Sequence, residues 1–244
     1  MRTIGIDSGS TTTKGVLMED GKLIKHCLIP TSARPVESMQ EIYRELSEGG
    51  ADRIVTTGYG RALLPEADKK VTEITCHGKG ASWLLDGARS VIDIGGQDCK
   101  VMLLGEDGRV VDFLMNDKCA AGTGRFVEMM MRIMEVPMDG LDAFVEGKDP
   151  VNVTSMCTVF AESEIISLLA EDTDPGSIAM GMIHAICRRT AYFAKKLNPS
   201  GPVFFTGGLA GCRCFQEVIS LYLQLPVQTD PLSQYAGAIG AALM

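Results

Sequence analysis

The chain has 244 residues, 45% of them hydrophobic, so it can form one large domain or two small ones with a sizeable core. Its formal net charge of −8 argues against a protein that binds nucleic acid or an anionic membrane surface. No apolar run approaches the length of a membrane span and no signal peptide is visible, so we expect a cytoplasmic protein without membrane contacts.

Hydrophobic periodicity predicts the elements of the first part of the chain. A helix should begin after Pro35, because apolar residues from Met39 to Leu46 recur at helical spacing. A short strand should end in the Gly-rich turn 57–61. The expected strands lie near 3–7, 14–19, 22–29 and 54–56, and a second helix lies near 76–86.

The rest of the chain begins with a second three-strand meander at about 89–115 and then becomes mostly helical. Strands followed by crossover helices, twice, indicate an α/β protein with two domains and a cleft between them. We place the domains at 1–88 and 89–244, with the last helix packing back on the first domain. The helices are expected at about 123–135, 159–171, 176–197, 211–224 and 233–243, with one strand at 203–206.

The same polar turn occurs twice in the chain. Asp7 ends an apolar strand and is followed by glycine and hydroxyl residues up to Lys14; Asp93 and Lys100 bracket a similar turn at the same spacing. A carboxylate beside free backbone N–H groups offers a partner for Mg²⁺ and for phosphate oxygens. Two such turns facing each other would hold a nucleotide polyphosphate between two related domains.

Two later segments complete a possible nucleotide site. Paired glycines after the strand at 203–206 would let the backbone lie flat against adenine or ribose. The small-residue tail from Gln234 suits either a hinge between domains or simple close packing of helices. The residues expected to bind the nucleotide are Ser8, Gly9, Ser10, Thr11, Thr12, Lys14, Gly95, Gly96, Thr206, Gly207, Gly208, Leu209, Gln234 and Gly237.

With these segments the chain resembles the acetate and sugar kinase, heat-shock cognate and actin superfamily. The resemblance implies two duplicated actin-like (ribonuclease H-like) domains with ATP or ADP in an interdomain cleft. It implies that Asp7 and Asp93 act through Mg²⁺ and its waters, and Gln97 is our candidate for orienting the attacking water. Lys14 would reach the phosphates only in the right strand register, and otherwise it would be solvated.

Two cysteines stand apart from the other six. Cys119 and Cys157 each precede an expected amphipathic helix, whose partly positive N-terminus would lower a thiol pKa. Both could be ordinary buried cysteines. A four-thiolate iron–sulfur cluster would need two copies of the chain, as a two-fold dimer supplies. We read Cys27, Cys76 and Cys187 as packing residues. The Cys212–Cys214 pair could bind a metal, but its spacing is tight and no partner ligands lie nearby in the sequence, so we read it as packing too.

The two cysteine segments, 116–126 and 154–164, make the resemblance closer. Together with motifs at 5–14, 57–61, 73–78 and 93–100, they resemble the ATP-dependent activators of 2-hydroxyacyl-CoA dehydratases, which are BadF/BadG-type ATPases. The resemblance implies an oxygen-sensitive homodimer with one [4Fe-4S] cluster, bridged by Cys119 and Cys157 of each chain. ATP binding and hydrolysis would change the conformation at the cluster. A low-potential electron, supplied by ferredoxin or flavodoxin, would pass to a dehydratase-like iron–sulfur enzyme.

Two other functions remain open at this stage. A small-molecule kinase, for example of the amino-sugar type, would share the nucleotide site, but it needs an aspartate base in a substrate pocket and no convincing candidate is visible. A non-redox ATP-dependent regulatory switch would bind ATP and carry no iron. Iron and sulfide content would separate both alternatives from the activator.

Overall fold

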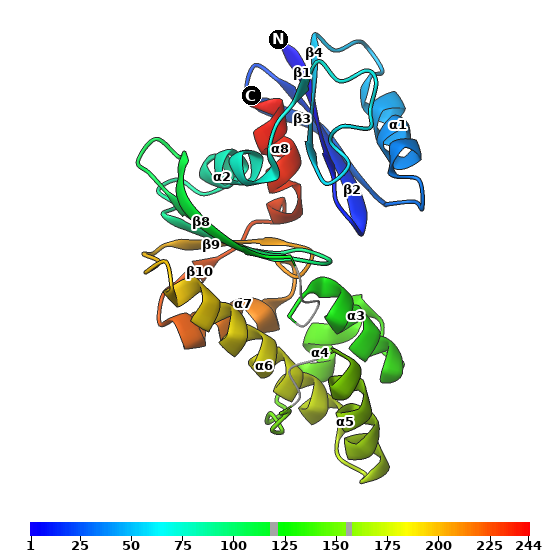
Figure 1. Ribbon diagram of the computed structural model, residues 1–244, viewed down its shortest axis with the longest axis vertical. Helices are drawn as coiled ribbons and strands as arrows, with labels where there is room; N and C mark the ends of the chain where they lie inside the picture. The colour runs from blue at the N-terminus through cyan, green and yellow to red at the C-terminus, as the bar shows by residue number, and fades with distance from the viewer. Residues whose placement is uncertain (118–121, 155–157) are drawn as a thin grey trace. The chain divides into compact units, whose positions relative to one another are not determined.

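The computed structural model describes residues 1–117, 122–154 and 158–244 (Figure 1). The fold is mixed α/β with two five-stranded sheets, which confirms the fold class predicted from the sequence. The chain divides into two compact units. Unit 1 comprises Met1–Val91, Met102–Phe113 and Asp230–Met244, and unit 2 comprises Ile92–Val101 and Leu114–Thr229.

The first sheet lies in unit 1 and has the strand order β3-β2-β1-β4-β5. Strands β1, β2 and β3 form an antiparallel meander, and β4 pairs with β1 in parallel. The strands are β1 (Arg2–Ser8), β2 (Thr12–Glu19), β3 (Lys22–Pro30), β4 (Arg53–Gly58) and β5 (Lys69–Lys70).

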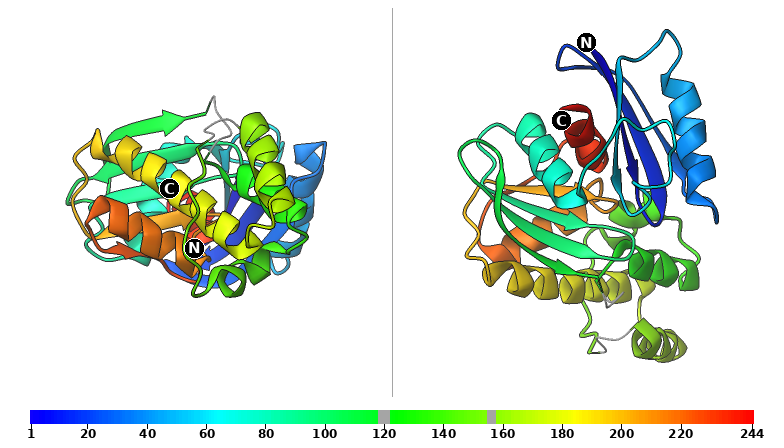
Figure 2. Two further views of the ribbon diagram at one scale, coloured as in Figure 1. Left: turned by 90° about the horizontal axis from the view of Figure 1, so that it is seen from below. Right: turned by 45° about the horizontal axis from the view of Figure 1, so that its top comes forward.

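Helices cover both faces of this sheet, with α1 (Pro35–Leu46) on one face and α8 (Ala236–Ala242) on the other (Figure 2). Met39 and Ile42 of α1 pack with Ile4 and Ile6 of β1. Every residue of α8 is buried, and α8 also packs on α2 (Glu73–Leu84). The approach of α2 and α8 is close: a Cβ at Gly80 would collide with the carbonyl oxygen of Ala236. A 3₁₀ turn, η2 (Ser233–Tyr235), leads into α8.

The second sheet has the strand order β10-β9-β6-β7-β8, and β6, β7 and β8 contribute residues to both units. β9 and β10 are parallel. The strands are β6 (Ser90–Ile94), β7 (Cys99–Leu104), β8 (Val110–Asn116), β9 (Val203–Gly207) and β10 (Val227–Gln228).

The helices of unit 2 share one apolar core with the strands of that unit. The long helix α6 is capped at its N-terminus by Asp174, whose carboxylate accepts a hydrogen bond of 2.8 Å from the amide of Ser177. Helix α7 lies beside it (Figures 1 and 2). The helices are α3 (Gly124–Ile133), η1 (Met138–Gly140), α4 (Leu141–Val145), α5 (Thr158–Ala170), α6 (Pro175–Lys195) and α7 (Arg213–Leu223).

The elements expected from periodicity are all present, whereas the short ones, β5, η1, α4 and β10, were not predicted because they hold too few residues to show a period. The expectation that α5 is amphipathic is wrong. Ala161 and Ile165 are buried, but Phe160 and Ile166 are exposed, so the helix is apolar on more than one face. Among the described residues, no helix is both long and apolar enough to cross a membrane.

Candidate nucleotide site

The two polar turns predicted from the duplication close in the same way. In the first turn the amide of Gly9 donates a hydrogen bond of 3.1 Å to the carbonyl of Thr12. In the second turn the amide of Gly95 donates one of 2.9 Å to the carbonyl of Asp98. Gly9 and Gly95 occupy equivalent positions, two residues after the aspartate. The repeated sequence therefore produces a repeated backbone conformation.

The first turn gathers buried oxygen atoms that lack partners. Asp7 Oδ1, Ser8 Oγ, Thr11 Oγ1 and Thr57 Oγ1 are all buried, and none has a hydrogen-bond partner in the part of the chain that the structure describes. A buried polar atom without a partner costs about 1–3 kcal/mol, so such a cluster fits a site for a polar ligand. Hard oxygen donors of this kind are the ligands that Mg²⁺ prefers.

The backbone around Asp7 allows a close approach from two directions. Thr57 lies beside Asp7 because β1 and β4 pair in parallel with these residues in register. Gly58 follows with φ +84°, and a Cβ there would collide with Asp7 Oδ1. A Cβ at Gly237 would lie 2.6 Å from Asp7 Oδ2 and 2.9 Å from His77 Cε1. Gly237 thus lets the start of α8 pack directly on Asp7.

Strand register places Lys14 at the first turn. Lys14 pairs directly with Asp7 across β1 and β2, so both side chains lie on the same face of the sheet. A Cβ built on Gly9 would lie 3.5 Å from Lys14 Nζ, so the ammonium group reaches over the turn. The register condition for a phosphate contact is therefore met, and the contact itself stays a prediction.

The second turn has a different charge arrangement. Lys100 is buried, with 1% of its side chain exposed, and its Nζ lies 3.1 Å from Asp93 Oδ2 and 2.7 Å from Asp98 Oδ2. Thr206 Oγ1 donates to Asp93 Oδ1 at 3.5 Å. This ion pair was not predicted from the sequence, although the matched positions of Lys14 and Lys100 were a signal for it.

The glycine pair after β9 lies against the second turn. The amide of Gly208 donates a hydrogen bond of 3.1 Å to the carbonyl of Ile94. Gly207 has φ +97°, and a Cβ there would collide with that same carbonyl, so a side chain is excluded for structural reasons. A Cβ at Gly208 would meet no described atom within 4 Å. Only Gly208 therefore presents an open backbone surface.

The remaining predicted residues are placed as follows. Gln97 is exposed at the tip of the second turn, and Leu209 is buried. The partly buried residues are Gly9, Ser10, Thr12, Gly95, Gly96 and Gln234. Cys119 and Cys157 lie outside the described residues.

The second turn is hydrogen-bonded to the start of α3. The amide of Gly124 donates to the carbonyl of Gly95 at 2.8 Å, and the amide of Arg125 donates to the carbonyl of Gly96 at 3.1 Å. Two orphan N–H groups of the first turn of α3 are thereby satisfied by the polar turn itself. The segment that contains Cys119 leads directly into this helix.

The six described cysteines are free thiols. Burial raises the pKa of the thiols of Cys27, Cys76 and Cys99 to about 12, and that of Cys212 to about 11. Burial also raises the pKa of Cys187 and Cys214 well above the ordinary value. The raised pKa favours the neutral thiol form of these side chains in the metal-free protein.

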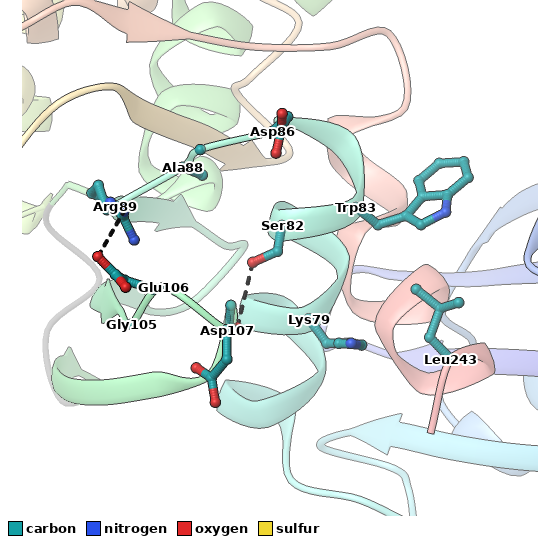
Figure 3. A pocket seen from close by; sticks show the side chains of 12 residues that line it. Lys79, Ser82, Trp83, Asp86, Ala88, Arg89, Gly105, Glu106, Asp107 and Leu243 are labelled. Carbon is teal, nitrogen blue, oxygen red and sulfur yellow. Dashed lines mark hydrogen bonds and ion pairs between the residues drawn. The ribbon is translucent and has the colours of Figure 1, made fainter.

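A cavity of about 510 Å³ lies in unit 1 beside α2 and the turn between β7 and β8 (Figure 3). Its walls carry charges of both signs, including an ion pair of 3.8 Å between Arg89 and Glu106. Trp83 and Leu243 add an apolar side. None of the described residues predicted to bind the nucleotide lines this cavity, so we assign it no part in nucleotide binding.

Comparison with known proteins identifies the family. Residues 4–244 match the BadF/BadG/BcrA/BcrD ATPase family. The chain belongs to this family. The resemblance inferred from the motifs is thereby confirmed.

Similar members of the BadF/BadG/BcrA/BcrD ATPase family span nearly the same length. The chain is 50% identical to the uncharacterized Escherichia coli protein YjiL, over 99% of this chain and 96% of that protein. It is 39% identical to the (R)-2-hydroxyglutaryl-CoA dehydratase activating ATPase of Acidaminococcus fermentans, over 99% and 95%. The fold is also similar to a solved structure, the activator of the 2-hydroxyisocaproyl-CoA dehydratase from Clostridium difficile with bound ADPNP. The TM-score is 0.93 at 36% identity, and the match covers 100% of this chain and 93% of that one.

We expect Gly208→Val to weaken ADP binding by about tenfold or more, because a branched side chain at this open position would crowd the adenosine. Isothermal titration with ADP and Mg²⁺ measures the effect. Gly211→Val is the matched control, since a Cβ there also meets nothing within 4 Å and the residue lies outside the predicted site. Unchanged affinity in Gly208→Val would place the adenosine elsewhere.

Proposed function

We propose that this protein is an ATP-hydrolysing iron–sulfur activator that transfers a low-potential electron to a partner 2-hydroxyacyl-CoA dehydratase-type enzyme. The observation that carries the proposal is the cluster of unpartnered buried oxygens at the first turn, in a chain of an ATPase family. The relative from Acidaminococcus fermentans, a dehydratase-activating ATPase by name, points to the activator role.

The first turn would hold the metal–nucleotide complex through oxygen atoms. Asp7 Oδ1 would accept hydrogen bonds from water on Mg²⁺, and the hydroxyls of Ser8, Thr11 and Thr57 would complete a hard-donor environment. Lys14 would neutralise phosphate charge above Gly9. When bound, Mg²⁺ supplies positive charge that stabilises the charge developing on the transferred phosphoryl oxygens.

The second turn would connect nucleotide binding to the cysteine segment. The carbonyls of Gly95 and Gly96 accept hydrogen bonds from the first amides of α3. A shift of this turn would therefore displace the start of α3. Five positions before Gly124, in the segment leading into the same helix, stands Cys119. A nucleotide that binds two conformations differently can bias their equilibrium, and this hydrogen-bonded path would carry the change.

Cys119 and Cys157 are the cysteines we propose as ligands of a [4Fe-4S] cluster shared by two chains. The cluster, when bound, supplies a one-electron carrier. They are the cysteines of the segments 116–126 and 154–164, which resemble the cysteine segments of the dehydratase activators. A ferredoxin or flavodoxin is the donor we propose for the electron.

Anaerobic purification followed by iron and sulfide analysis tests this function. We expect a brown, oxygen-labile homodimer with about four irons and four sulfides per dimer, as one cubane shared by two chains requires. ATP hydrolysis should accompany electron delivery to the partner enzyme. A colourless protein without iron that still hydrolyses ATP would favour the kinase or the regulatory switch instead.

A further inference from the structure

The two phosphate turns have diverged in the group that faces their lysines. Position by position, Asp98 of the second copy stands where the first copy has Thr12. Lys14 makes no hydrogen bond or ion pair with another described residue, whereas Lys100 is paired with two carboxylates. The lysine is thus common to both copies, but only the second copy has a second carboxylate to hold it.

The geometry of the second turn concentrates two negative charges on one point. Asp93 Oδ2 and Asp98 Oδ2 both lie within 3.1 Å of Lys100 Nζ, and the Asp93 side chain is only 3% exposed. Without the ammonium group, this point would be lined by oxygens of two carboxylates. Such a donor set attracts hard divalent cations such as Mg²⁺ and Mn²⁺.

We propose that Lys100 is the internal counter-ion of the second turn, and that its ammonium group occupies the place between Asp93 and Asp98 that a divalent cation would otherwise take. The turn then binds a divalent cation only together with a nucleotide. This inference rests on the proposed nucleotide site and adds a positioning residue to it. Lys100 also fixes the orientation of the Asp93 carboxylate. In this orientation the carboxylate would accept hydrogen bonds from waters of a metal–nucleotide complex.

The physical reason is competition between charges at short range. A divalent ion approaching the two carboxylates meets a fixed positive charge at hydrogen-bond distance from both of them, and the burial of Lys100 limits solvent screening. The phosphates of a nucleotide bring their own negative charge and remove this penalty. An empty protein would therefore stay free of trapped metal and remain ready to exchange nucleotide.

The test is a titration of the anaerobically purified protein with Mn²⁺ in the absence of nucleotide. The electron paramagnetic resonance signal of free Mn²⁺ measures how much of the ion is bound. We expect the wild type to bind weakly and Lys100→Met to gain one site per chain, with affinity raised by about tenfold or more. Lys100→Arg keeps the charge and should gain no site. Lys14→Met is the matched control from the other copy, where Thr12 replaces the second carboxylate, and it should gain no site either.

Two further measurements keep the test decisive if Lys100→Met is unstable. Loss of a buried partner leaves uncompensated charge, so the variant could require metal to fold. In that case Mn²⁺ should restore its circular dichroism, and adding Asp98→Asn should abolish the Mn²⁺ requirement. One tightly bound Mn²⁺ per wild-type chain without nucleotide that is lost in Asp98→Asn would overturn the proposal, as would a Lys100→Met variant that gains no site or is not rescued by Mn²⁺.

The same samples distinguish this inference from the proposed function. ADP binding to the wild type in the presence of Mg²⁺, measured by titration calorimetry, tests the nucleotide site by itself. Absence of ADP binding would defeat the proposed function. If the wild type binds ADP normally but Lys100→Met gains no Mn²⁺ site, only the proposed role of Lys100 as counter-ion would be rejected.

Discussion

Replacement of Asp7 or Asp93 by alanine should lower the rate of Mg²⁺-dependent ATP hydrolysis by about 100-fold or more, the size of effect seen when a preorganised charge-stabilising group is lost. Both residues end a central strand at equivalent positions of the two polar turns. Asp7 carries an oxygen without a described partner, and Asp93 is held by Lys100 and Thr206. Steady-state phosphate release measures the effect.

The two variants should differ in stability although both lose activity. Asp7→Ala removes a buried oxygen that has no described partner, so it should be tolerated, whereas Asp93→Ala takes away one partner of buried Lys100. Asn has nearly the same size and shape as Asp, so Asp93→Asn is the variant to measure if Asp93→Ala does not fold. Asp107→Ala, at the exposed far end of the second hairpin, is the control that should hydrolyse ATP normally. Near-normal turnover in Asp7→Ala and Asp93→Asn would contradict the assignment.

Local sequence sufficed to predict the two turns. An aspartate at a strand end and glycine two residues later determine the hydrogen bonds that close both turns, and these involve neighbours in the chain. The strands and long helices could also be predicted, because their hydrophobic periodicity extends over many residues. The predicted domain limits, the interdomain cleft and the roles of the site residues stay predictions.

Contacts between residues that lie far apart in the chain were harder to predict from the sequence. Thr57 reaches Asp7 through parallel strand pairing, which periodicity does not specify. Buried Lys100 pairs with Asp98, which stands where the first copy has Thr12. The sequence contains this difference between the copies, but only the ion-pair geometry shows what it does. The prediction for α5 is wrong for a similar reason, because tertiary packing decides which apolar residues of a helix are buried, and Phe160 and Ile166 are exposed.

Cys119→Ser and Cys157→Ser should each remove the iron, weaken the dimer and abolish electron transfer to the partner enzyme. Four thiolates are required for a [4Fe-4S] cluster, and two cysteines from each of two chains provide them. Iron and sulfide analysis, the visible spectrum and sedimentation velocity measure these effects on the anaerobically purified variants. ADP binding should survive in both, because the polar turns and the glycines after β9 lie elsewhere in the chain.

The described cysteines provide the matched controls for this prediction. Serine at Cys27, Cys76, Cys99, Cys187, Cys212 or Cys214 should leave about four irons per dimer, because these six free cysteines lie outside the proposed ligand set. Cys99→Ser is the most informative of them, since Cys99 immediately precedes Lys100 in the chain. Four irons in each monomer, or iron retained in the Cys119→Ser Cys157→Ser double variant, would contradict the bridged cluster and leave the kinase and the regulatory switch as the better explanations of the nucleotide site.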